Sequence, residues 1–207
     1  MLAHAMALAV ATDLPVSADL ENGYADKPVE VADTIRLAAQ AGLAGCSVED
    51  VPQGRGRDPY EISLAADRVR AAAEVAHSLP FPFTLTARAE NFIVGHPDLR
   101  DTIARLQAFQ EAGADVLFAP GLKTKEDIRT VVQSVDRPIN VIMGLQGVQL
   151  SLADLSEVGV KRVSVGSALA RSALGAFLRA ARELKAQGTF SFAEDAVKYA
   201  DLNAMFA

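Results

Sequence analysis

Short β-rich runs alternate with longer helix-forming runs along nearly the whole chain, and this alternation constrains the fold more than any other feature. The predicted strands are Pro15–Asp19, Gly45–Glu49, Phe83–Arg88, Asp115–Ala119, Ile139–Met143 and Arg162–Gly166. The predicted helices are Val29–Ala41, Glu61–Ser78, Asp98–Ala112, Lys125–Ser134, Leu152–Val158 and Ser167–Gln187. Strands that alternate with helices indicate βα units packed around a parallel sheet.

The number of predicted strands leaves two α/β architectures open. Six strands fit an open, doubly wound sheet, or a (β/α)8 barrel of about 30 residues per unit that lacks roughly two units. The chain also begins with a helix-forming run, Met1–Thr12, instead of a strand. This start favours a TIM-type (β/α)8 barrel whose first two βα units are absent from the chain.

The domain organisation follows from the lack of any linker-like or low-complexity tract. We expect residues 1–207 to form a single, incomplete α/β-barrel domain. Gly188 ends the preceding helix pattern, and residues 189–207 have the apolar and charged pattern of a separate amphipathic helix. This C-terminal helix would dock onto its own domain, which is the simpler expectation, or be exchanged with a partner subunit.

Charge and cysteine content limit the classes of partner and compartment. The net charge is −6, so there is no excess of basic residues to attract nucleic acid or an anionic membrane, and we expect neither as a partner. The single cysteine, Cys46, excludes an internal disulfide and fits a reducing compartment. The apolar N-terminal run has no Lys or Arg before it, unlike a signal peptide. We therefore expect a cytoplasmic protein.

Charged residues gather at the carboxyl ends of the first three predicted strands. Asp19 and Glu21 end the first strand, Glu49 the second, and Arg88 and Glu90 the third. Ligands of parallel α/β folds bind at this edge of the sheet. Oxygen ligands from one or two carboxylates suit Mg²⁺, and an Arg suits an anionic substrate. Each acid alone could simply cap a helix, but together they favour a site.

Four segments carry a family resemblance. In order along the chain they read PVSADLENGY, AGLAGCSVED, LTARAENF and QEAGADVLFAPG. The chain resembles the isocitrate lyase/phosphoenolpyruvate mutase superfamily over essentially its whole length. The resemblance implies a barrel, a homo-oligomer (dimer or tetramer), Mg²⁺, and a small α-oxo or α-hydroxy carboxylate as substrate. It also implies cleavage or formation of a C–C or C–P bond.

The same resemblance assigns roles to individual residues. Asp19 matches a metal-binding acid, and Glu21 and Glu49 match acids that hold the ion directly or through water. Arg88 matches the residue that binds the substrate carboxylate. Glu90, two residues further on, matches another acid, and the catalytic acid or base is expected to be Glu90, water or a residue that the sequence does not identify.

The sequence departs from the family pattern in ways that keep three functions open. The lyases' Lys-Lys-Cys-Gly-His loop is absent from residues 51–60, and Cys46 lies on the strand instead. The next strand end, Ala119-Pro120-Gly121, has neither the His of the mutases nor the Glu of the lyases. A C–C lyase is the leading expectation. A C–P mutase or hydrolase and a non-catalytic truncated barrel are the alternatives.

Several weaker signals complete the candidate site. Arg55, in a Gly- and Arg-rich loop, could bind an anionic substrate or lie in solvent. Asn140, polar within an apolar strand, could point into the site or satisfy a local backbone group. His96 could reach the mouth of the site, although a surface loop position is the simpler expectation. The turn at residues 165–168 could bind phosphate, or Ser167 could cap the following helix.

Overall fold

The computed structural model describes residues 1–54 and 58–206. The chain divides into two compact units, Met1–Ser164 and Val165–Ala207. None of the helices in the described ranges is long and apolar enough to cross a membrane.

A single six-stranded parallel sheet forms the centre of the first unit. Its strands are β1 (Ser17–Asp19), β2 (Gly45–Glu49), β3 (Thr84–Arg88), β4 (Val116–Phe118), β5 (Ile139–Ile142) and β6 (Arg162–Ser164). Their order in space is their order in sequence, and every neighbouring pair is parallel. All six predicted strands are therefore confirmed, with ends that differ by no more than two residues.

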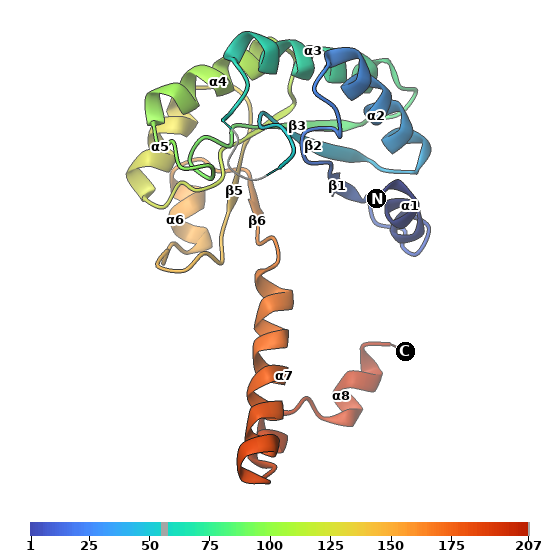
Figure 1. The fold of residues 1–207 in the computed structure, drawn as a ribbon, viewed down its shortest axis with the longest axis vertical. Coiled ribbons are helices and arrows are strands. Elements are labelled where there is room, and N and C mark those ends of the chain that lie inside the picture. The colour runs from blue at the N-terminus through green and yellow to red at the C-terminus, as the bar shows by residue number, and fades with distance from the viewer. Residues whose placement is uncertain (55–57, 207) are drawn as a thin grey trace. The chain divides into compact units, whose positions relative to one another are not determined.

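Except for α1, which precedes β1, the helices of the first unit follow the strands as predicted. They are α1 (Leu2–Ala9), α2 (Pro28–Gln40), α3 (Ile62–Ser78), α4 (Leu99–Glu111), α5 (Lys125–Gln133) and α6 (Leu152–Glu157). Figure 1 shows α2 to α6 wrapped around the outer side of the curved sheet. Sequential strand order with helices on one side is the winding of a barrel, not of a doubly wound sheet. Within the described residues β6 does not pair with β1, so the unit is a parallel half-barrel, and a complete barrel stays a prediction.

The two faces of the sheet have different chemistry, because side chains alternate along each strand. On the outer face, Cys46, Val48 and Leu85 are buried in the apolar core beneath the helices. The inner face is rich in polar side chains. Cross-strand register pairs Glu49 with Arg88, Arg88 with Phe118, and Phe118 with Asn140, so these residues project to the same side. The burial of the outer face thus fixes which charged groups line the inner one.

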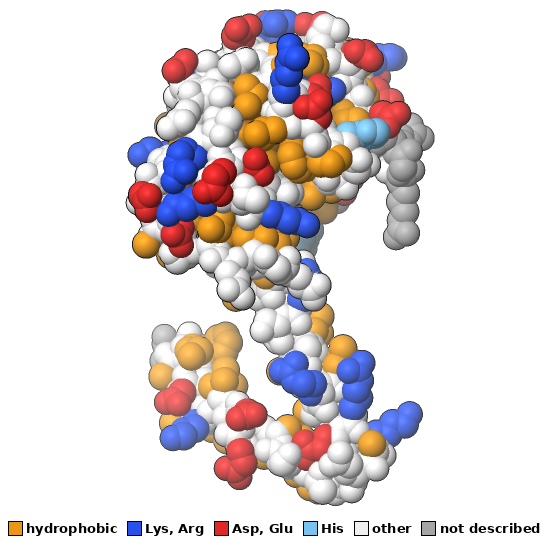
Figure 2. All heavy atoms as spheres, turned by 90° about the vertical axis from the view of Figure 1, so that its left-hand side faces the viewer, with side chains coloured by type: hydrophobic (Ala, Val, Ile, Leu, Met, Phe, Trp, Pro, Cys, Tyr) orange, Lys and Arg blue, Asp and Glu red, His pale blue; other side chains and the backbone are white. Residues whose placement is uncertain are grey.

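Charges of both signs are interspersed on the face shown in Figure 2. Among the surface ion pairs of the first unit, Lys125 Nζ lies 2.9 Å from both Asp154 Oδ1 and Glu157 Oε2. Neither sign dominates that face, in keeping with the overall balance of 20 basic and 26 acidic residues.

The second unit consists of α7 (Ala168–Gln187), the 3₁₀ turn η1 (Ser191–Asp195) and α8 (Tyr199–Ala204). The prediction of one helix over residues 189–207 is wrong. Glu183 accepts hydrogen bonds from Thr189 Oγ1 at 2.8 Å and from Ser191 N at 2.6 Å, which turns the start of the segment back toward α7. The backbone of Ala196 is then extended, so two short helical pieces form. No residue of η1 or α8 is buried, and docking of this segment stays a prediction.

Candidate active site at the carboxyl ends of the strands

Arg88, the last residue of β3, is the centre of a cluster of acids from three neighbouring strand ends. Its Nε donates to Glu90 Oε1 at 2.8 Å, and its Nη2 lies 3.2 Å from Glu49 Oε2. Its Nη1 donates to Asp19 Oδ2. The guanidinium carbon lies 5.3 Å from the centre of the Phe118 ring, a cation–π distance. The structure therefore brings together four of the five residues that the sequence placed at this edge.

The electrostatics of the cluster are dominated by burial and by an excess of carboxylates. Burial raises the pKa of Glu49 to about 7, because the opposing effect of Arg88 is partly cancelled by the neighbouring acids. Burial also raises the pKa of Glu90, again against the effect of Arg88. The pKa of Arg88 is lowered by burial but raised more strongly by Glu90, Asp19 and Glu49. One guanidinium thus faces more negative charge than it can neutralise.

Glu21 lies beside this cluster but is held differently. Its backbone N–H donates to Asp19 Oδ1 at 3.0 Å, and its side chain accepts from Gln53 Nε2 at 3.0 Å. Its carbonyl accepts from Glu49 N at 2.8 Å, which ties the β1–α2 loop to the end of β2. Glu21 and Glu49 are thereby neighbours through the backbone, although Glu21 makes no ion pair with Arg88 in the described part of the chain.

The donor set fits a hard divalent cation in an open site. All candidate ligands are carboxylate oxygens, and their excess negative charge would be relieved by a cation. Within residues 1–54 and 58–206, no three Asp, Glu, His or Cys side chains converge into a complete metal cage. Mg²⁺ does not require one, because it keeps several waters and often takes only one or two protein carboxylates.

Comparison with known proteins identifies the family. The family model described as phosphoenolpyruvate phosphomutase matches residues 1–185. The chain belongs to this family. Among solved structures, a Burkholderia cenocepacia J2315 protein, described only in general terms as a lyase/mutase, is 56% identical with a TM-score of 0.95, over 100% of this chain and 74% of that one. The 2,3-dimethylmalate lyase structure, from the isocitrate lyase/PEP mutase superfamily, is 28% identical with a TM-score of 0.80, over 92% and 67%.

Curated sequence relatives point to the same superfamily. An uncharacterised protein of Mycobacterium tuberculosis (strain H37Rv) is 34% identical over 168 residues, 81% of this chain and 60% of that protein. The "Probable 2-methylisocitrate lyase 2" of Corynebacterium glutamicum is 31% identical, over 81% and 56%. An oxaloacetate decarboxylase of Rhodopseudomonas palustris is 30% identical, over 75% and 52%. The chain thus spans between about half and three fifths of the length of these relatives.

Asn140, another predicted site residue of this phosphoenolpyruvate phosphomutase family member, makes no contact with Arg88 in the described structure. Asn140 is buried and projects to the inner face, but its amide donates to Ser164 Oγ at 3.1 Å and accepts from Arg162 Nη1 at 3.0 Å. These bonds tie β5 to β6, with Phe118 between Asn140 and Arg88 in the register. A role for Asn140 in substrate binding stays a prediction. Arg55 lies outside the described residues.

Two further predictions concern surface positions. His96 Nε2 lies 2.8 Å from Asp58 Oδ1, with both side chains largely exposed, as expected of a loop residue. Ser167 occupies the N-cap position of α7, but its side chain makes no capping hydrogen bond. A role for this turn in binding phosphate stays untested.

A layer of buried polar residues beneath the cluster escaped the sequence analysis. Asp50 accepts from Glu90 N at 2.9 Å and from Arg105 Nη1 at 3.0 Å, which joins the ends of β2 and β3 to α4. Arg68, on α3, is almost completely buried and donates to backbone carbonyls in the loop after β1 and at the end of β2. The available signal was a charged residue at a core position of a helix, since Arg68 lies between Ala65 and Ala72 on the buried face.

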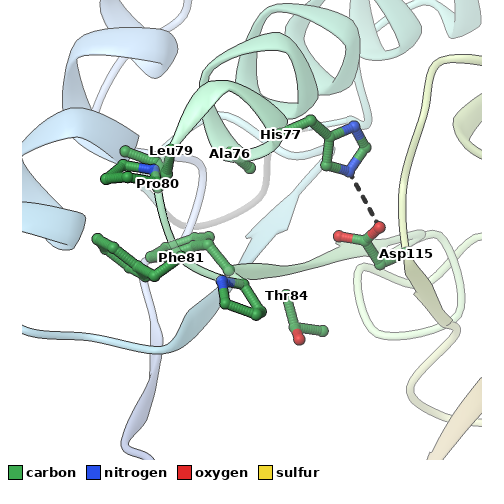
Figure 3. A pocket seen from close by; sticks show the side chains of 9 residues that line it. Ala76, His77, Leu79, Pro80, Phe81, Thr84 and Asp115 are labelled. Carbon is green, nitrogen blue, oxygen red and sulfur yellow. Dashed lines mark hydrogen bonds and ion pairs between the residues drawn. The ribbon is translucent and has the colours of Figure 1, made fainter.

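A pocket at the opposite edge of the sheet has a different character (Figure 3). It lies at the amino ends of β3 and β4, between Phe81, Thr84 and Asp115. His77 Nε2 lies 3.0 Å from Asp115 Oδ1, and Asp115 Oδ2 accepts from Leu85 N at 2.8 Å. Residues at the amino ends of barrel strands generally serve stability, so this pair is assigned to joining α3 with the sheet.

Proposed function

We propose that the chain is a Mg²⁺-dependent lyase-type enzyme that cleaves a C–C bond in a small 2-oxo or 2-hydroxy carboxylic acid. The observation that carries the proposal is the Arg88 guanidinium, held among Asp19, Glu49 and Glu90 at the carboxyl edge of the sheet. The lyase and decarboxylase names of the relatives support it, as each acts on a small carboxylic acid.

Arg88 is the group proposed to bind the substrate carboxylate. A guanidinium presents parallel N–H groups that match a carboxylate, and a site removed from water strengthens such bonds. Contact with Glu90 at Nε fixes the plane of the guanidinium, while Nη1 and Nη2 point toward Asp19 and Glu49. The same two Nη groups would meet the carboxylate of a substrate at the mouth of the site.

Asp19, Glu21 and Glu49 are the residues proposed to hold Mg²⁺, directly or through water. When bound, the ion supplies Lewis-acid stabilisation of the negative charge that develops on the substrate oxygens. Holding a cation would also stabilise the ionised form of Glu49, which burial otherwise disfavours. Asp19 and Glu49 would then no longer depend on Arg88 alone for neutralisation.

Glu90 is the residue proposed to move the proton. Its carboxyl is buried and lies against Arg88, so it is oriented toward the site and withheld from bulk water. Burial raises its pKa, which makes it a better proton acceptor near neutral pH. Cleaving the C–C bond of a 2-hydroxy acid removes the hydroxyl proton and adds a proton to the carbanion that is released, and Glu90 would take up the hydroxyl proton.

Turnover of a small substrate panel tests the proposal. Oxaloacetate, isocitrate, 2-methylisocitrate, 2,3-dimethylmalate and phosphonopyruvate would be followed by NMR with Mg²⁺ and then with excess EDTA. We expect depletion of one C–C substrate that EDTA abolishes and that Asp19→Ala reduces strongly. Unchanged Mg²⁺-dependent turnover by Asp19→Ala would refute the metal assignment. A folded protein that consumes none of the five would favour the non-catalytic alternative.

C–P chemistry is a second candidate, supported by the comparisons. The family model that matches the chain is described as phosphoenolpyruvate phosphomutase. A structure from Burkholderia cenocepacia J2315 that is described as a phosphonomutase is 32% identical, with a TM-score of 0.78. A phosphorus NMR spectrum separates the two candidates. Conversion of phosphonopyruvate to phosphoenolpyruvate, or release of phosphate, would replace the C–C assignment.

A homo-oligomer is part of the same proposal. The second unit exposes large apolar side chains along α7, among them Leu169, Leu174 and Phe177. Apolar area of this kind is typical of surfaces that associate. Light scattering coupled to size exclusion would give the mass of the particle, and a monomer at micromolar concentration would contradict this part of the proposal.

A further inference from the structure

The loop between β1 and α2 has a backbone that ordinary residues rarely adopt. Glu21 has a φ of 51° and Tyr24 a φ of 55°, both in the left-handed region, and Gly23 between them has a φ of 74°. Non-glycine residues are disfavoured there, so such a conformation persists only where surrounding contacts impose it. This is the loop that carries Glu21 and follows directly on Asp19, two of the proposed metal-binding acids.

Arg68 makes the most extensive of these contacts. Its Nη2 donates to the carbonyl of Asn22 and, at 2.9 Å, to that of Ala25. Its Nη1 donates to the carbonyl of Glu49 at 3.0 Å. One guanidinium therefore joins the strained loop to the end of β2. The guanidinium carbon lies 4.3 Å from the centre of the Tyr60 ring, which closes over it.

Thr34, on α2, holds the same loop from the other side. Its Oγ1 donates to the carbonyl of Gly23 at 2.7 Å, and its side chain is buried. The carbonyls of three residues in the loop, Asn22, Gly23 and Ala25, are thus bound by side chains from two helices. Each bond is local to this loop, so its loss would act there before it acted on the rest of the sheet.

We infer that Arg68, together with Thr34, is a positioning residue that holds the β1–α2 loop so that Asp19 and Glu21 face Glu49 and Arg88. Neither residue touches the cluster through its own side chain in the described structure; both act through the backbone. The expected effect of these residues on Mg²⁺ affinity rests on the proposed function, whereas their expected effect on the stability of the loop does not.

Hydrogen exchange of the metal-free protein tests the effect on the loop. Arg68→Lys keeps the charge but loses the fork of donors that reaches three carbonyls. The backbone amides of Leu20, Gly23 and Glu49 are hydrogen-bonded in or against the loop, and those of Ala89 and Leu117 pair across β3, β4 and β5. We expect exchange of the first group to rise about tenfold more than that of the second. Arg70→Lys, exposed on the same helix, is the matched control and should change neither group.

Calorimetric titration with Mg²⁺ tests the effect on the site. We expect Arg68→Lys to weaken Mg²⁺ binding about tenfold, the change expected from the loss of one charge-assisted hydrogen bond. Thr34→Val removes only a hydroxyl and keeps the branched shape. Like Arg68→Lys, it should speed hydrogen exchange in the loop and weaken Mg²⁺ binding. If Arg68→Lys does not fold, the result for Thr34→Val decides whether the loop is held by these side chains.

Three outcomes are informative. Selective loop exchange with weaker Mg²⁺ binding supports the inference. An equal rise of exchange in both amide groups would overturn the inference. So would the absence of any rise in folded Arg68→Lys or in Thr34→Val. If the wild-type protein itself binds no Mg²⁺, the metal part of the proposed function fails, and loop exchange alone decides whether Arg68 and Thr34 position the loop.

Discussion

Arg105 Nη1 donates to Asp50 Oδ2 at 3.0 Å, and both side chains are almost fully buried. The same Asp50 accepts the backbone N–H of Glu90, while Arg105 also donates to the carbonyl of Tyr60 at 2.7 Å. This pair therefore fixes the ends of β2 and β3, where Glu49, Arg88 and Glu90 lie, against α4. The acids of the candidate site depend on a second layer of charge beneath them.

Arg105→Met should destabilise the protein by about 3–5 kcal/mol, because it leaves Asp50 buried without its cation. Urea unfolding at pH 7 measures the loss. Arg129→Met is the control, since Arg129 lies 3.9 Å from Glu157 on the surface and should cost under about 0.5 kcal/mol. Adding Asp50→Asn to Arg105→Met should recover part of the loss. If the two arginine variants lowered the free energy of unfolding equally, the buried Arg105–Asp50 pair would contribute no more to stability than an exposed pair.

The stability of the metal-free protein should fall as pH rises from about 4.5 to about 7. Over this range the unfolded chain releases the proton of Glu49, whose ordinary pKa is 4.5, while the folded protein keeps it up to a pKa of about 7. The folded state binds more protons, so raising the pH favours unfolding, by on the order of 1–3 kcal/mol. Urea midpoints from pH 4 to 8 measure this slope.

Glu49→Gln isolates the contribution of this one carboxyl. We expect the variant to match the wild type below pH 4.5 and to be more stable than it at pH 8, because the amide cannot ionise. Glu157→Gln, which removes an exposed carboxyl on α6, is the control for the loss of one negative charge. A Glu49→Gln profile parallel to that of the wild type would show that Glu49 titrates normally.

The sheet and the centre of the site could be predicted because each depends on local pattern. Alternating runs located all six strands, and parallel strands end at one edge, so the side chains at their ends had to meet. Asp19, Glu49, Arg88 and Glu90 were brought together for that reason. The family resemblance added roles for these residues, which geometry alone would not supply.

The supporting contacts could not be predicted because their partners lie far apart in sequence. Arg68 binds carbonyls that precede it by 19 to 46 residues, and a backbone carbonyl leaves no mark in the sequence. Asn140 has a similar ambiguity, since an inward amide can serve a ligand or a neighbouring strand, and here it bonds to Arg162 and Ser164. The division of residues 189–207 depends on Glu183, which lies outside that segment.

Arg88→Lys should lower kcat/KM about 100-fold, mainly through a higher KM. A lysine keeps the charge but cannot bind a carboxylate through two parallel N–H groups, nor contact Glu90, Glu49 and Asp19 at once. Initial rates on the active substrate of the panel measure the effect. Arg100→Lys, exposed on α4, is the control and should keep wild-type rates. Wild-type KM in Arg88→Lys would mean that another group binds the carboxylate.

Glu90→Gln should lower kcat by a factor of about 10² to 10⁴, because the amide cannot carry a proton. Its carbonyl can still accept from Arg88 Nε, so the guanidinium stays in place and KM should change little. In the wild type, kcat/KM should rise with pH as Glu90 loses its proton, at a pKa that burial raises above the usual range of a Glu. This rise of kcat/KM with pH should be absent from the profile of Glu90→Gln. Glu126→Gln, on the surface of α5, should retain it. If Glu90→Gln kept both the wild-type kcat and the rise of kcat/KM with pH, a different residue would transfer the proton.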